Sequence, residues 1–167
     1  ALGAWRGGLG GSTCYDELLP AKPLVDAMNQ NQGRSALIVG ADWPLVDPDL
    51  CARALELHLS NTEAMKMTFT QAPPGLAGIA IGIELLQQIA EINSTFGRLL
   101  AYDPKHPQAD AIGLDVCVQI EATVRSCARR FIYDTPRSAL LIDTVAHELG
   151  SSVDHADARI IANAVHG

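Results

Sequence analysis

Residues 35–47 read SALIVGADWPLVD, and the fold prediction rests on this stretch. Its apolar run, residues 36–39, lacks the polar–apolar alternation of a half-exposed strand. It therefore predicts a short strand buried on both faces, as in a parallel sheet covered by helices. Gly40 and Ala41 break the run, and Asp42 follows at the carboxyl end of the strand. Ligands of open α/β sheets bind at that end, where a carboxylate can hold a divalent cation and its phosphates.

Helical and strand patterns alternate on both sides of this stretch, which is typical of an α/β protein. We expect a three-layer, mostly parallel sheet with helices on both faces, in one domain spanning residues 1–167. His58 is expected on the surface of its helix, and Asp154 is expected to cap the last helix. The predicted helices are residues 12–29, 47 or 49 to 60, 83–92, 121–130 and 136–149, and the predicted strands are residues 36–39, 65–70, 114–120 and 131–133.

Composition excludes several classes of protein. Hydrophobic residues make up 48% of the chain and charged residues 19%, which is ordinary for a globular protein and excludes wholesale disorder. A net charge of −7 argues against a nucleic-acid partner, which calls for a basic face. No apolar stretch is long enough for a membrane helix and no signal peptide is visible, so no membrane partner and a cytoplasmic location are predicted. The four cysteines show no CxxC spacing, which favours free buried thiols.

Two apolar segments each end in Asp-x-Pro, at residues 42–44 and 134–136. The separation is long enough for intervening elements to return the chain to the same sheet edge. Two carboxylates brought together there repel each other, and Mg²⁺ satisfies both while leaving positions open for phosphate oxygens and water. The alternative is that each Asp only caps the helix that follows it. Because the motif occurs twice, we weigh the two interpretations equally.

The motifs GADWPL, PDL and YDTPRS resemble those of nucleotidyltransferases of the glycosyltransferase-A fold. That family includes molybdenum-cofactor guanylyltransferases and cytidylyltransferases of sugar acids. In it a strand-end Asp binds magnesium, and an acidic or amide position near a DTP-like turn completes the site. The resemblance implies that Asp42 and Asp134 are the catalytic residues and hold Mg²⁺. It also implies two partners: a nucleoside triphosphate, and a phosphorylated acceptor such as a sugar phosphate or cofactor phosphate, to which a nucleoside monophosphate is transferred.

Further segments are predicted to bind substrate. Residues 73–82, PPGLAGIAIG, fall where the family builds its acceptor-side pocket. The glycine-rich residues 7–11 resemble a segment upstream of the acidic strand in related proteins, and their amides can approach a phosphate. Arg137 follows Asp134 closely and is a phosphate contact. The predicted substrate-binding residues are Gly10, Gly11, Pro74, Gly75, Gly78 and Arg137.

One feature of the family is missing from the sequence. The family opens with a strand and a Gly-rich loop that ends in a basic residue, and no stretch here matches that loop. We interpret the chain as a fragment with this loop upstream of Ala1; if the chain is complete, activity is not expected. The alternatives to a nucleotidyltransferase are therefore a catalytically inactive α/β binding module and a glycosyltransferase of the same fold. The sequence also leaves room for a homodimer.

Overall fold

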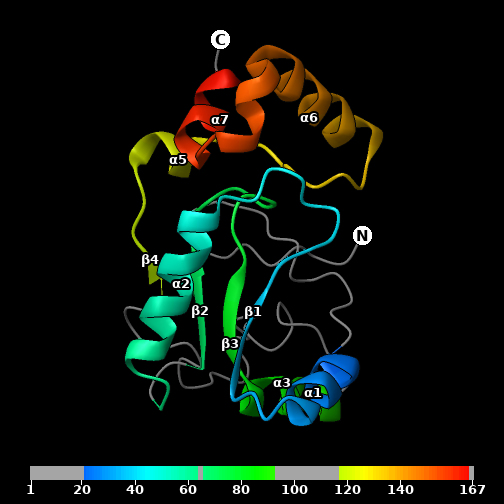
Figure 1. Cartoon of the computed structure of the whole chain (residues 1–167), viewed down its shortest axis with the longest axis vertical. Coiled ribbons are helices and arrows are strands. Elements are labelled where there is room, and N and C mark those ends of the chain that lie inside the picture. The colour runs from blue at the N-terminus through cyan, green and yellow to red at the C-terminus, as the bar shows by residue number, and fades with distance from the viewer. Residues whose placement is uncertain (1–20, 64–65, 93–116, 166–167) are drawn as a thin grey trace, which may run out of the picture.

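A computed structural model of the chain describes residues 21–63, 66–92 and 117–165, which form a mixed α/β fold (Figure 1). No helix in these ranges is both long and apolar enough to cross a membrane. The elements are, in chain order, α1 (Ala21–Gln30), β1 (Ser35–Ile38), α2 (Pro48–Ser60), β2 (Met67–Thr70), β3 (Ile79–Gly82), α3 (Ile83–Ile92), β4 (Cys117–Val118), α5 (Ala122–Ser126), α6 (Pro136–Leu149), the 3₁₀-helix η2 (Gly150–His155) and α7 (Ala158–Ala164).

The four described strands form one sheet in the order β1-β3-β2-β4. Strand β3 is antiparallel to both β1 and β2, whereas β2 and β4 are parallel. The prediction of a mostly parallel sheet is therefore wrong for these strands, because the short connection after β2 returns the chain alongside it as an antiparallel neighbour. Strands β1, β2 and β4 still share one direction, so their carboxyl ends lie at one edge of the sheet.

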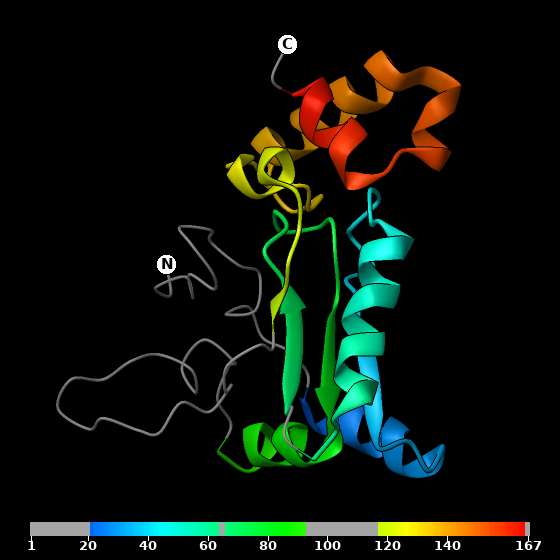
Figure 2. The ribbon, with the colours of Figure 1, turned by 90° about the vertical axis from the view of Figure 1, so that its left-hand side faces the viewer.

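One face of the sheet packs against α2, and apolar side chains of the other face join a cluster with α1 and α3. Met67 and Ile79 point to one face and belong to a buried cluster that includes residues of α1 and α3. Thr68 points to the opposite face and contacts His58 of α2. Figure 2 shows α2 running alongside the strands, with α1 and α3 at the end of the sheet where β1 and β2 begin.

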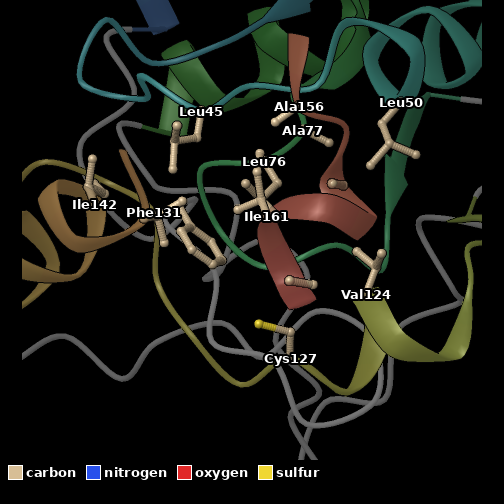
Figure 3. Packing of buried hydrophobic residues seen from close by; sticks show 13 residues of the cluster. Leu45, Leu50, Leu76, Ala77, Val124, Cys127, Phe131, Ile142, Ala156 and Ile161 are labelled. Atoms are coloured by element: carbon tan, nitrogen blue, oxygen red, sulfur yellow. The ribbon is translucent and has the colours of Figure 1, made fainter. Parts of the chain in front are cut away.

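The helices α5, α6 and α7 gather beyond the carboxyl ends of β1 and β2 (Figures 1 and 2). They enclose a second buried cluster, in which Leu45 and Leu76, from the connections that follow β1 and β2, meet Phe131 and Ile161 (Figure 3). Leu76, Phe131 and Ile161 are at most 1% exposed. The C-terminal helices are thus attached to the sheet through the loops at its carboxyl edge, and burial of these side chains holds the loops in place.

Several sequence predictions are corrected by the structure. Strand β1 is an edge strand among those described and is half-buried, not buried on both faces. Residues 131–133 form no strand, because the two ends of the segment bond to two different loops and no ladder results. The cap of the last helix is Asp157 and not Asp154, which lies inside η2. His58 is fully buried. The predicted strand residues 65 and 114–116 lie outside the described ranges.

Candidate functional site

Three segments meet at the carboxyl edge of the sheet: residues 40–45 after β1, residues 71–76 after β2, and residues 131–135 before α6. The amide of Phe131 donates to the carbonyl of Pro74 at 2.8 Å, and the amide of Tyr133 donates to the carbonyl of Asp42 at 2.8 Å. The third segment therefore links the other two. We refer to these three segments as the rim.

Asp42 and Asp134 are brought close at the backbone, because Asp42 bonds to Tyr133, the residue that precedes Asp134. The sequence predicted that two positions 92 residues apart would meet at one sheet edge, and this backbone contact confirms that their chain segments do. The Asp42 side chain is exposed and makes no hydrogen bond or ion pair to the part of the chain that the structure describes. One carboxylate at the rim is thus accessible to a ligand.

The carboxylate of Asp134, by contrast, has partners within the protein. Arg130 forms an ion pair with its Oδ2, and the hydroxyl of Ser138 donates to its Oδ1 at 3.0 Å. The Arg130 guanidinium and the Ser138 hydroxyl hold the pKa of Asp134 below its usual range, against a smaller opposing effect of burial. Ser138 also exchanges hydrogen bonds with Thr135, the N-cap of α6. Asp134 therefore helps to hold the start of α6 through Ser138, but the N-cap of α6 is Thr135, so the alternative that Asp134 itself caps the helix is wrong.

The turn at residues 71–76 is held rigidly by the third segment. Gly75 has φ +94°, and a Cβ there would lie 2.2 Å from the carbonyl oxygen of Phe131. At Gly78 a Cβ would lie 2.5 Å from the carbonyl oxygen of Ile38. Both glycines are thus explained by close approach of another backbone segment. Ligand contacts of Pro74, Gly75 and Gly78 stay predictions.

Asp47 anchors two helices beside the rim and is only 4% exposed. Its Oδ1 accepts hydrogen bonds from the amides of Asp49 and Leu50, in the first turn of α2. Its Oδ2 accepts a hydrogen bond at 2.8 Å from the amide of Ala158, the first residue of α7. The sequence left the start of this helix open between Asp47 and Asp49, and the structure shows that Asp47 is the cap, whereas the contact with α7, across 111 residues, had no sequence signal.

His58 lies away from the rim, between α2 and the sheet. Its Nε2 is 3.0 Å from the hydroxyl of Ser35, and its Nδ1 is 3.4 Å from that of Thr68. Burial lowers the pKa of His58, which favours the neutral ring. Because the imidazole is fully buried, the Ser35–His58 pair has no access to a substrate and serves packing. Burial also raises the pKa of the Cys51 and Cys127 thiols, so neither is poised as a nucleophile.

Among the described residues no group of three or more His, Cys, Asp or Glu side chains could hold a metal by itself. This does not exclude Mg²⁺, which is usually bound through one or two carboxylates together with substrate phosphates and water. Asp42 meets that requirement, and Asp134 adds a carboxylate that is already hydrogen-bonded. Arg137 is exposed in the first turn of α6, and the predicted Gly10 and Gly11 contacts lie outside the described ranges.

The rim also holds two residues that the sequence analysis did not single out. Tyr133 is 51% exposed, its amide bonds to the carbonyl of Asp42, and its hydroxyl donates to Oδ1 of Asp143 in α6 at 3.5 Å. Gln71 has a buried side-chain oxygen with no hydrogen-bond partner in the described part of the chain. Comparison of the chain with protein-family models, with characterised proteins and with solved structures finds no match.

Proposed function

We propose that the rim is the magnesium and acceptor side of a nucleotidyltransferase active site of the glycosyltransferase-A type. One observation carries the proposal: the exposed Asp42 carboxylate lies at the carboxyl edge of the sheet, on a loop bonded directly to the segment that leads to Asp134 and α6. Ligands of α/β sheets bind at that edge, and the aligned peptide dipoles of α6 favour an anion near its first turn.

The rim and the first turn of α6 supply the residues for the proposed reaction. A phosphate oxygen of the acceptor attacks the α-phosphorus of the nucleoside triphosphate, the bond to the β-phosphate breaks, and pyrophosphate leaves. Asp42 would be the first carboxylate ligand of the Mg²⁺ that neutralises charge on the phosphates, and Asp134 would be the second. Arg137, in the first turn of α6, binds and orients a phosphate. The rigid turn at residues 71–76 positions the acceptor.

The ion pair of Arg130 with Asp134 supports a second candidate, a binding module without turnover. In this interpretation Asp134 has only a structural role, and the carboxylate of Asp42 alone binds a metal–nucleotide complex with low affinity. The two candidates differ in pyrophosphate release, which only the first predicts when Mg²⁺, a nucleoside triphosphate and a phosphorylated acceptor are combined.

Calorimetric titration of CTP and GTP, with and without Mg²⁺, tests the proposed site. We expect Mg²⁺-dependent binding to the wild type, weakened at least about tenfold in Asp42→Ala because a metal-coordinating carboxylate is lost. Asp49→Ala is the matched control, since Asp49 is an exposed carboxylate in the first turn of α2. Its affinity should equal that of the wild type. Equal nucleotide binding by Asp42→Ala and wild type, or binding that ignores Mg²⁺, would contradict the proposal.

A further inference from the structure

Gln71 carries an unsatisfied acceptor at the rim. Its side-chain oxygen Oε1 is buried and has no hydrogen-bond partner among the residues that the structure describes. Buried polar atoms in folded proteins are nearly always paired, because an unpaired carbonyl loses its hydration without compensation. An exception at a candidate binding edge is therefore a candidate position for contact with a ligand.

The location of Gln71 relates it to Asp42. Gln71 is the first residue after β2, so it lies at the same sheet edge as the loop that carries Asp42. Strand β3 separates β1 from β2, which places the two strand ends about 10 Å apart. A phosphate joined to one sugar ring can bridge such a separation. A ligand with its phosphate near Asp42 can thus extend toward Gln71.

The backbone around Gln71 is held in place. The amide of Ala72 donates to the hydroxyl of Thr70 at 3.2 Å, and the carbonyl of Pro74 accepts the Phe131 amide. The Gln71 residue as a whole is only half-buried, and the last side-chain torsion of a glutamine rotates readily. The side-chain amide of Gln71 can therefore turn without movement of the backbone.

We propose that Gln71 is a specificity residue for the acceptor, and that its side-chain carbonyl accepts a hydrogen bond from a sugar hydroxyl of a phosphorylated sugar. The inference rests on the proposed function for the identity of the second substrate. A carbonyl can accept from a hydroxyl, whereas it repels an anionic oxygen. Gln71 thus distinguishes the sugar end of the ligand from its phosphate end.

Gln71→Met tests the inference because it keeps the length of the side chain and removes the carbonyl. Without ligand, loss of an unpaired buried acceptor should raise the Tm of the variant by about 2–4 °C. The matched control is Gln88→Met at an exposed position of α3, where Gln and Met have similar helix propensities and the Tm should change by less than about 1 °C.

Ligand titrations use α-D-glucose 1-phosphate, α-D-mannose 1-phosphate and inorganic phosphate, each with Mg²⁺. Gln71→Met should weaken binding of at least one sugar phosphate about tenfold while leaving the affinity for inorganic phosphate unchanged. The inference is overturned if neither sugar phosphate binds the wild type, or if the variant binds each sugar phosphate as tightly as the wild type does. Equal weakening of sugar phosphate and inorganic phosphate also overturns it.

Titration of the same variants with Mg²⁺ and CTP or GTP separates this inference from the proposed function. Gln71→Met should bind the nucleotide as the wild type does, and Asp42→Ala should not. Suppose that Gln71→Met loses sugar-phosphate binding while Asp42→Ala binds the nucleotide as the wild type does. The nucleotidyltransferase proposal then fails, but the inference that Gln71 binds a sugar phosphate stands. If Asp42→Ala alone has its expected effect, only the Gln71 inference fails.

Discussion

Replacing Asp47 is expected to weaken two helices at once. The carboxylate accepts three amide hydrogen bonds, two from α2 at 2.8 and 3.1 Å and one from Ala158 of α7 at 2.8 Å. Loss of a helix N-cap costs about 1 kcal/mol, and leaving the buried Ala158 amide without a partner costs about 1–3 kcal/mol more. We therefore expect Asp47→Ala to lower the free energy of unfolding by about 3 kcal/mol.

Urea unfolding followed by far-UV circular dichroism measures this loss as a lower midpoint with an unchanged m-value. The control is Asp157→Ala, which removes the N-cap of α7 at an exposed hydrogen bond to the Ile160 amide and should cost about 1 kcal/mol. A loss in Asp47→Ala no greater than that in Asp157→Ala would refute the reasoning, because it would mean that the Oδ2 contact to α7 contributes nothing.

Two further predictions concern His58 and Gly75. Burial lowers the pKa of His58 below 6.5, so as the pH falls this histidine is protonated in the unfolded chain before it is protonated in the folded one. The contribution of His58 to stability is therefore complete above about pH 6.5 and declines as the pH falls from there toward the folded-state pKa. The difference in unfolding free energy between about pH 7.5 and about pH 5.5 should shrink in His58→Gln, and an identical pH dependence in both proteins would contradict this. Gly75→Ala should lower the free energy of unfolding by about 3 kcal/mol or more, because Gly75 has a positive φ and a Cβ there would overlap Phe131. The control is Gly33→Ala, whose Cβ would have no neighbour closer than 3.7 Å and which should change stability by less than about 1 kcal/mol. Equal effects of the two substitutions would exclude the close approach at Gly75.

The rim shows where sequence reasoning succeeded and where it could not. The repeated Asp-x-Pro motif correctly predicted that the chain segments of Asp42 and Asp134 meet at one sheet edge. It could not show that Arg130 and Ser138 bind Asp134, because arginine and serine four residues from an aspartate are common on protein surfaces and such a spacing does not show that they are in contact. The unpaired Gln71 oxygen had no signal either, since burial of a single atom depends on packing from distant segments.

Local signals in the sequence were sufficient for α2, α3 and α6, whereas the helix predicted over residues 121–130 covers only Ala122–Ser126. Asp47 and Pro48 marked the start of α2, apolar spacing marked α3, and Gly150 marked the end of α6, because helical hydrogen bonds and caps join residues only a few positions apart. The pairing of the strands, the edge position of β1, the burial of His58 and the bond from Asp47 to α7 were settled only in the folded chain. All of these features depend on contacts between residues far apart in sequence. An apolar run or a polar side chain does not by itself show which distant segment it will contact.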